Sequence, residues 1–168
     1  MNKGTIQVIC GEGKGKSTAA IGKGIGALLK GQTVIMIQFL KGCQDQISCD
    51  ILKRLEPEMK IFRFEKSDGF FETLSKEQQE EERMNIRNGL NFAKKVLSTG
   101  ECDMLILDEI LGLLDQKIIE NEELIKLFES KVDEMDVILT GKIFPHELEP
   151  YVDGIQEIDH LKVDNTKQ

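Results

Sequence analysis

A run of glycines close to the amino terminus has the residue types and spacing of a phosphate-binding loop. Gly11, Gly13 and Gly15 follow a short β-branched stretch, and Lys16 and Ser17 open a predicted helix. Glycines let successive backbone amides turn toward one anion, and the amino end of a helix adds partial positive charge. The Lys16 ammonium supplies a full charge, and the Ser17 hydroxyl is a suitable ligand for Mg²⁺. The spacing therefore predicts a site for phosphate groups.

This loop differs from the usual Walker A order at its first glycine. The standard pattern, G-x-x-x-x-G-K-[S/T], requires glycine at position 10, where this chain has Cys10. A glycine-rich turn that binds nothing is the alternative interpretation. The agreement between strand, loop, Gly-Lys-Ser and helix favours phosphate binding.

An acidic pair follows another apolar run, in the manner of a Walker B strand. Met104–Leu107 are four apolar residues, and Asp108 and Glu109 come directly after them. A carboxylate beside a phosphate loop holds Mg²⁺ directly or through water. A solvated strand end would give the same pattern, but the phosphate loop upstream favours a functional pair.

The sequence Thr140-Gly141-Lys142 also follows a predicted strand. A hydroxyl and a cation at a strand end suit contact with phosphate, and an ordinary turn is the alternative. Ligands of parallel α/β sheets bind at the carboxyl ends of strands, so all three motifs belong to the same edge.

Four of the eight phenylalanines lie within ten residues. Phe62 and Phe64 alternate, which is typical of core positions on a strand. Phe70 and Phe71 are adjacent and follow a turn dipeptide, so they cannot easily both face one core. We expect at least one of them to be exposed to a flat apolar ligand.

Apolar runs and turn signals place these motifs on alternating strands and helices. The first strand, the loop, a helix ending near Gly31 and the second strand form a βαβ unit, so these strands should run parallel. The pattern predicts the α/β class: a three-layer P-loop NTPase-like (RecA-like) fold with a mostly parallel sheet flanked by helices. Glycines at positions 22, 24 and 26 of the first helix are expected to pack closely on the sheet. Strands are expected at 5–10, 34–39, 60–64, 104–107 and 137–139, and helices at 16–30, 76–97 (capped by Ser75) and 122–130.

Length and charge narrow the classes of protein. At 168 residues and 19.0 kDa, the chain is expected to form one nucleotide-binding domain, residues 1–168, with a polar tail from about 163. A net charge of −8 argues against a binder of nucleic acid or of anionic membranes. No apolar run approaches the ~20 residues of a membrane span, and no signal peptide is expected. The four cysteines lack metal-site spacing and are expected to be reduced thiols of a cytoplasmic protein.

Taken together, these motifs resemble those of the ATP:corrinoid adenosyltransferases of the P-loop type. The resemblance extends from Thr5 to about Ile158 and includes the displaced first glycine of the loop. The segments that carry it are GEGKGKSTAA from Gly11, IQFLKG from Ile37, LDE from Leu107, LTGK from Leu139 and VDGIQEI from Val152.

The resemblance implies transfer of the 5′-deoxyadenosyl group of ATP to Co(I) of a corrinoid, a cobalamin or a cobinamide, with release of triphosphate. This step belongs to cobalamin biosynthesis. The implied ligands are ATP, Mg²⁺ (or Mn²⁺) and the corrinoid, and the implied partners are a reducing flavoprotein and a second copy of the chain. The implied residues are Glu12, Gly13, Lys14, Gly15, Lys16, Ser17, Thr18 and Lys142 for the nucleotide, Ser17, Asp108 and Glu109 for the metal, Lys16 and Glu109 for catalysis, and Phe70 and Phe71 for the corrinoid.

Several features differ from the family pattern, among them the C-terminal Ala-Gly and Gly-Ile-Glu elements, which are not recognisable in residues 159–168. The aromatic loop is one residue shorter and has no tryptophan, Gly26 stands in place of an arginine, and Lys142 replaces the arginine of Thr-Gly-Arg. These differences leave two other functions open: an ATP-binding regulator or chaperone without the chemistry, and a small P-loop kinase or NTPase. The products distinguish them, because a kinase releases ADP, an NTPase releases phosphate and the transferase releases intact triphosphate.

Overall fold

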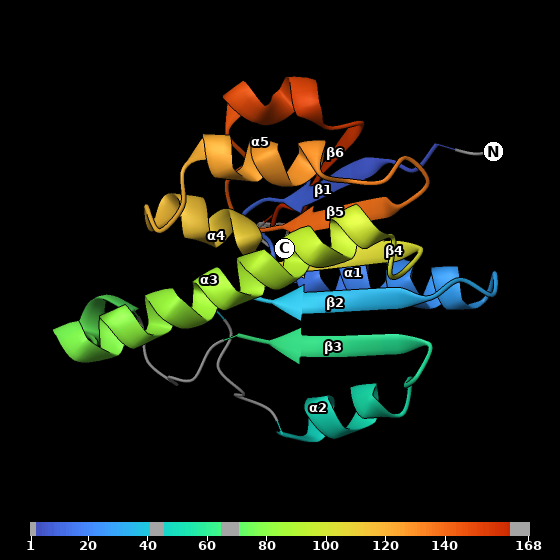
Figure 1. The fold of residues 1–168 in the computed structure, drawn as a ribbon, viewed down its shortest axis with the longest axis horizontal. Coiled ribbons are helices and arrows are strands. Elements are labelled where there is room, and N and C mark those ends of the chain that lie inside the picture. Colours follow the sequence, from blue (N-terminus) through green and yellow to red (C-terminus); the bar gives the residue numbers. More distant parts are fainter. Residues whose placement is uncertain (1–2, 41–45, 65–70, 162–168) are drawn as a thin grey trace, which may run out of the picture.

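A parallel β-sheet forms the centre of the molecule. The computed structural model describes residues 3–40, 46–64 and 71–161, with only the backbone of 46–49, and in that part the sheet has six strands. Their order is β3-β2-β4-β5-β1-β6, and each neighbouring pair is parallel (Figure 1). The strands are β1 (Ile6–Cys10), β2 (Val34–Gln38), β3 (Met59–Arg63), β4 (Met104–Asp108), β5 (Asp136–Thr140) and β6 (Gly154–Glu157).

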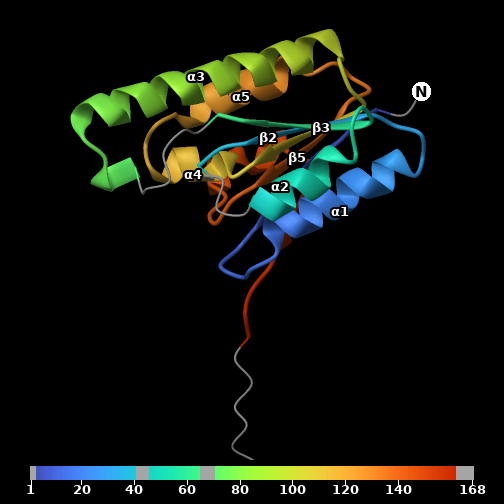
Figure 2. The ribbon, with the colours of Figure 1, turned by 90° about the horizontal axis from the view of Figure 1, so that it is seen from below.

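Helices cover both faces of the sheet, which confirms the predicted three-layer arrangement. Figure 2 shows α1 (Lys16–Leu28) and α2 (Gln46–Lys53) on one face. The opposite face carries α3 (Lys76–Thr99), α4 (Ile110–Asp115) and α5 (Asn121–Glu129). Two short 3₁₀ helices, η1 (Phe71–Thr73) and η2 (His146–Tyr151), complete the set in the described residues. None of the helices there combines the length and the apolar composition that crossing a bilayer requires.

The first two strands are parallel, as predicted, but they are not neighbours. Strands β4 and β5 lie between β1 and β2 in the sheet. Insertion of β4 and β5 brings the carboxyl end of β4 between those of β2 and β5. The acidic pair therefore lies close to the phosphate loop, although about 90 residues separate them in sequence.

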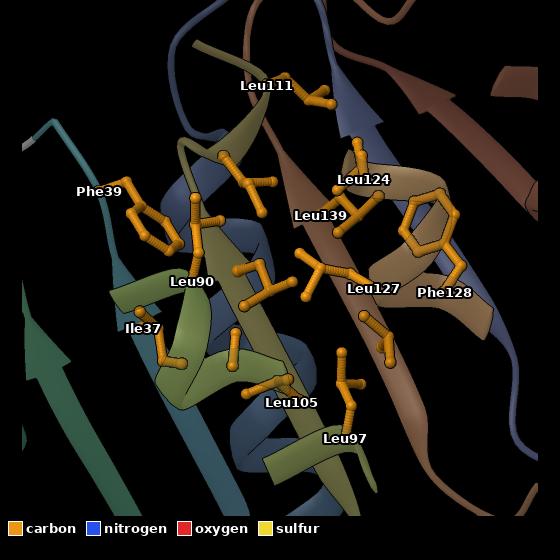
Figure 3. Packing of buried hydrophobic residues seen from close by; sticks show 14 of the residues in the cluster. Ile37, Phe39, Leu90, Leu97, Leu105, Leu111, Leu124, Leu127, Phe128 and Leu139 are labelled. Atoms are coloured by element: carbon orange, nitrogen blue, oxygen red, sulfur yellow. The ribbon is translucent and has the colours of Figure 1, made fainter. Parts of the chain in front are cut away.

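Along β1 to β5, side chains alternate between two apolar clusters, whereas the residues of β6 belong to neither. On β2, Val34 and Met36 pack with the residues of α1, whereas Ile35 and Ile37 pack with those of α3. Figure 3 shows the larger cluster, in which leucines of α3 and α5 pack against β4 and β5. The smaller cluster lies under α1 and includes Met36, Ile106 and Ile138. Two residues further along the same strands, on the same face of the sheet, are the polar residues Gln38, Asp108 and Thr140.

The long helix α3 begins and ends at the signals that the sequence offers. The Ser75 side chain accepts a hydrogen bond from the Gln78 backbone amide, and the Gln78 side chain accepts one from the Ser75 backbone amide. In this capping box both backbone amides donate and both side-chain oxygens accept, so two amide donors at the helix start are satisfied. Gly100 ends the helix in the left-handed conformation, with φ 65°.

Short elements were missed by the sequence analysis. Helix α4 has six residues and β6 has four, and both are too short for a hydrophobic period to stand out. Helix α2 and η2 were also not predicted. The core interpretation of Phe62 and Phe64 is confirmed, since both pack on the larger cluster and their rings lie 4.8 and 5.9 Å from that of Phe92.

The described cysteines are free thiols, in agreement with the expectation. Cys10 ends β1 and Cys102 precedes β4, and both are buried. Burial raises the pKa of Cys102 to about 12, so this thiol stays protonated. The side chains of Cys43 and Cys49 lie outside the described residues.

The glycines of α1 do not share one role. Only Gly24 packs closely, because a Cβ there would lie 3.2 Å from Ile106 Cδ1. A Cβ at Gly22 or Gly26 would meet no atom within 4 Å, so the expectation of close packing is wrong at these two positions. Both are therefore sites of low helix propensity without compensation from packing.

We expect Gly22→Ala to stabilise the protein by about 1 kcal/mol. Alanine removes backbone freedom from the unfolded chain, and its methyl group enters open space. Urea denaturation followed by circular dichroism measures the change, with Gly24→Ala as the matched variant. The gain at Gly24 should be smaller, because the new Cβ presses on Ile106. Equal or lower stability of Gly22→Ala would contradict this reading of α1.

Candidate active site

The phosphate loop connects β1 to α1 and is held by the backbone of two other segments. The Gly11 amide donates to the Lys142 carbonyl at 2.9 Å, and the Gly13 amide donates to the Ile158 carbonyl at 2.7 Å. A Cβ at Gly13 would lie 2.6 Å from that carbonyl oxygen, so only glycine fits this close approach. The position of Cys10 also explains the displaced glycine. Cys10 still pairs with Glu157 in the sheet, and the chain leaves the strand only at Gly11.

The loop ends in a conformation that opens the helix amino end. Gly15 precedes α1 with φ 100°, a left-handed value that side chains disfavour. The first helical hydrogen bond runs from the Ala19 amide to the Gly15 carbonyl. Amides ahead of that bond are the ones that a helix amino end offers to an anion. The Lys16 ammonium lies over the loop and donates to the Gly13 carbonyl at 2.8 Å.

An open depression of about 290 Å³ lies at this point. It brings together residues that the sequence placed in one nucleotide site, although Glu109 lies far from the others in the chain. Of the predicted loop residues, Glu12, Lys14 and Thr18 are exposed, and Lys16 and Ser17 are half-buried. The lining residues are Lys14, Gly15, Lys16, Ser17, Thr18 and Glu109.

Asp108 is the point at which the loop and the sheet meet. It is fully buried at the end of β4, and its Oδ1 accepts hydrogen bonds from Ser17 Oγ at 2.8 Å and Thr140 Oγ1 at 2.7 Å. Its Oδ2 lies 3.4 Å from Gln38 Nε2, which donates to it. The carboxylate therefore fixes the hydroxyl that the sequence analysis assigned to Mg²⁺.

Glu109 is held in an unusual backbone conformation. Its φ of 61° and ψ of 19° are left-handed values, which are uncommon for a residue other than glycine. The Glu109 amide donates to Thr140 Oγ1 at 2.9 Å, so the same hydroxyl contacts both acidic residues. This turn directs Glu109 to the wall of the depression beside Ser17.

The donor set suits Mg²⁺ in the way that nucleotide sites use it. The ion prefers oxygen ligands, and in such sites it takes one or two from the protein and the others from phosphates and water. Ser17 Oγ and the carboxylates of Asp108 and Glu109 are donors of that kind at one place. Within 3–40, 46–64 and 71–161, no three His, Cys, Asp or Glu residues form a metal site by themselves.

The two residues of the third motif have different surroundings. The Thr140 hydroxyl is fully buried and contacts Asp108 and the Glu109 amide, a use that the sequence did not indicate. The exposed Lys142 ammonium forms an ion pair with Glu12 at 3.1 Å across the mouth of the loop. Lys142 and Glu12 both line a separate depression of about 330 Å³ on the other side of the loop, which also includes residues of β6.

The predicted corrinoid residues are only partly described. Phe70 lies outside the described residues. Phe71 begins η1, is half-buried against the larger apolar cluster and has the Arg83 guanidinium 5.0 Å from its ring centre. Gln79 of α3 donates to the Phe71 carbonyl at 3.2 Å. Two residues of α3 therefore contact Phe71, Arg83 at the ring and Gln79 at the backbone.

The sequence analysis missed two site residues and the role of a third. Gln38, Arg63 and the hydroxyl role of Thr140 emerge only when strands that are distant in sequence are placed in register. Gln38 belongs to the IQFLKG segment and is only 5% exposed in the structure. Buried polar side chains are almost always hydrogen-bonded, so its burial indicates a hydrogen-bond partner.

Comparison with known proteins identifies the family of this chain. The family model of ATP:corrinoid adenosyltransferase BtuR/CobO/CobP matches residues 2–168. The corrinoid adenosyltransferase of Escherichia coli K12 is 27% identical over 160 residues, which cover 95% of this chain and 79% of that protein. The enzyme CobA of Salmonella typhimurium LT2 is 28% identical over 161 residues, with the same coverage.

Solved structures of proteins with other names share this fold. A KaiC-like protein of Pyrococcus horikoshii OT3 superposes with a TM-score of 0.63 at 20% identity, over 99% of this chain and 76% of that one. This likeness concerns the fold alone and confirms the P-loop NTPase-like prediction. The family match, by contrast, extends over residues 2–168 and so includes the loop, the acidic pair and Thr140-Gly141-Lys142. The chain belongs to the ATP:corrinoid adenosyltransferase family BtuR/CobO/CobP.

Proposed function

We propose that this chain transfers the 5′-deoxyadenosyl group of ATP to Co(I) of a reduced corrinoid and releases inorganic triphosphate. The observation that carries the proposal is the meeting of the phosphate loop with Asp108. Ser17 of the loop and Asp108 of β4 are joined by a 2.8 Å hydrogen bond at the carboxyl edge of the sheet. Membership of the family supplies the reaction type.

The reaction is a displacement at carbon and moves no phosphoryl group. The reduced corrinoid donates an electron pair to C5′ of ATP, a cobalt–carbon bond forms, and the C5′–O bond breaks. The triphosphate departs with the electrons of that bond. Cobalt carries no proton to remove, so a general base is not required. The protein must instead stabilise the negative charge that grows on the leaving oxygen.

The phosphate loop supplies this stabilisation in our proposal. The Lys16 ammonium would leave the Gly13 carbonyl for the triphosphate, and the amides at the start of α1 would point at the same oxygens. Ser17 and Glu109 would hold the magnesium ion, and Asp108 would fix Ser17. When bound, Mg²⁺ neutralises charge on the phosphate oxygens. Lys16 and Glu109 are therefore the residues that we assign to catalysis.

The rim residues complete the nucleotide site in our proposal. Glu12, Lys14 and Thr18 are exposed, and Lys142 is paired with Glu12. If Lys142 exchanged its ion pair with Glu12 for one with a phosphate, its ammonium would contact the nucleotide. A lysine contacts phosphate as a point charge rather than bidentately, so it replaces only part of an arginine contact.

An anaerobic assay tests the proposed reaction. The protein is mixed with Mg-ATP and chemically reduced Co(I) cobalamin, the cobalt spectrum is followed, and free triphosphate is measured. We expect a light-sensitive alkylcobalt product with one triphosphate for each cobalt alkylated. Release of ADP would indicate a kinase, and release of phosphate an NTPase. Tight ATP binding without any product would indicate a regulator that has lost the chemistry.

Phe71→Ala is expected to impair the reaction that starts from Co(II), by on the order of 10-fold, and to spare ATP affinity. We propose that Phe70 and Phe71 displace the lower ligand of cobalt, because a cobalt without that donor is easier to reduce. Rates are compared between Co(II) with a reductant and Co(I) formed beforehand. Met84→Ala on the exposed side of α3 is the control. Equal loss in both assays would count against a role in ligand displacement.

The cellular setting follows from the same chemistry. We propose that a reducing flavoprotein delivers the electron that forms Co(I), that the chain forms a homodimer, and that it works in the cytoplasm. The free thiols of Cys10 and Cys102 support a reducing compartment. Mn²⁺ is a candidate substitute for Mg²⁺, since the donor set consists of oxygen atoms.

A further inference from the structure

A row of polar side chains crosses three neighbouring strands at their carboxyl ends. Arg63 of β3, Gln38 of β2 and Asp108 of β4 are partners in the register of the sheet. Residues in register on parallel strands point to the same face. The residues two positions earlier on each strand pack in the cluster under α1, so the row lies on the α1 side, at the level of the phosphate loop.

Hydrogen bonds join this row in one direction. Arg63 Nε donates to Gln38 Oε1 at 2.7 Å. Gln38 Nε2 then donates to Asp108 Oδ2 at 3.4 Å, and Asp108 Oδ1 accepts from Ser17 Oγ at 2.8 Å. A continuous chain of hydrogen bonds therefore connects Arg63 of β3, across one face of the sheet, to the Ser17 hydroxyl of the phosphate loop.

The direction of the Gln38 amide depends on Arg63. A glutamine amide has a donor end and an acceptor end, and the two orientations have nearly the same shape. A guanidinium can only donate, so it selects the orientation in which Oε1 faces Arg63 and Nε2 faces Asp108. The reversed amide would place its oxygen against the Asp108 carboxylate. Gln38 is 5% exposed, which leaves little water to satisfy a wrong orientation.

We propose that Arg63 is a positioning residue for the magnesium end of the nucleotide site and acts through Gln38 on Asp108. The inference rests on the proposed function only in that Mg-ATP binds at the phosphate loop. Partners of this kind orient the groups that hold a metal, and their loss lowers metal affinity by about 10- to 100-fold. Arg63 thus contributes to metal-dependent ATP binding without itself being assigned to the metal or the triphosphate.

The test measures ATP binding rather than transfer. Equilibrium dialysis with labelled ATP gives the dissociation constant in Mg²⁺ and in EDTA, and the ratio of the two is the magnesium-dependent gain. We expect Arg63→Met to lower this gain about 10-fold and to leave the constant in EDTA unchanged. Arg63→Lys, which keeps one donor, should restore part of it. Lys60→Met, an exposed residue of the same strand, is the control and should keep the full gain.

A double substitution shows whether Arg63 acts through Gln38. If it does, Arg63→Met should have no further effect in a Gln38→Met background, so the double variant should match Gln38→Met alone. Effects that multiply would overturn the proposal and indicate a direct contact of Arg63 with substrate. An unchanged magnesium-dependent gain in Arg63→Met would overturn it as well. Urea denaturation of each variant verifies that it is folded.

The outcome is distinguishable from failure of the proposed reaction. Wild-type protein that shows the magnesium-dependent gain but releases no triphosphate would refute the transfer and leave the role of Arg63 standing. Wild-type protein that binds ATP equally in Mg²⁺ and EDTA would overturn the role of Arg63 directly.

Discussion

Lys16→Ala is expected to lower kcat/KM for ATP by roughly 10³-fold. The Lys16 ammonium is the full positive charge that lies directly over the loop, 2.8 Å from the Gly13 carbonyl. Charge grows on the triphosphate as the C5′–O bond breaks, so this contact strengthens in the transition state. Removal of such a group affects the rate more than the affinity for ATP, because only part of the charge is present in the ground state.

Anaerobic kinetics with Co(I) cobalamin and labelled ATP measure this loss, with triphosphate release as a second readout. Lys23→Ala is the matched control, since it removes an exposed charge from the same helix two turns away. The control should react like the wild type. Unchanged turnover of Lys16→Ala would refute the assignment of the phosphate loop.

The phosphate loop was predictable because its residues are contiguous. The glycines, Lys16 and Ser17 form one segment between a strand and a helix, and local conformation brings their polar groups together. The approach of Asp108 and Glu109 was predictable too, because the carboxyl ends of parallel strands share one edge. Neither inference needed the order of the strands.

The rest of the site depends on that order, and the sequence does not reveal it. Gln38 faces Asp108 because β2 and β4 are neighbours in register, yet the two residues are 70 positions apart. The contact between Gly13 and the Ile158 carbonyl uses backbone atoms, which leave no residue-type signal. Thr140 resembled a phosphate contact because the sequence shows a hydroxyl at a strand end but does not show its direction. In the structure this hydroxyl contacts Asp108 and the Glu109 amide.

Asp108→Asn is expected to lower kcat/KM for ATP by about 10²-fold or more and to abolish most of the magnesium dependence of ATP binding. The substitution keeps the size of the side chain and removes its negative charge. Ser17 and Thr140 hydroxyls both donate to Oδ1, so keeping both of these bonds requires the asparagine carbonyl at that position. The asparagine NH₂ must then face Gln38 Nε2, donor against donor.

Gln38 cannot relieve this conflict by turning its amide, because Arg63 holds Oε1 at 2.7 Å. A buried donor without a partner costs about 1–3 kcal/mol, so Asp108→Asn should also lower the free energy of unfolding by that amount. Replacing Gln38 by methionine removes the opposing donor. Asp108→Asn should therefore destabilise a Gln38→Met protein less than it destabilises the wild type, while the loss of magnesium dependence persists in both backgrounds.

Urea denaturation and equilibrium dialysis of the four proteins separate the two effects of Asp108, charge and hydrogen-bond polarity. Asp133→Asn, at an exposed position near the amino ends of the strands, is the control and should change neither. Loss of stability to the same extent in both backgrounds would show that Gln38 does not set the polarity at Asp108. Full magnesium dependence in Asp108→Asn would remove Asp108 from the metal site and leave Glu109 and Ser17 to hold the ion.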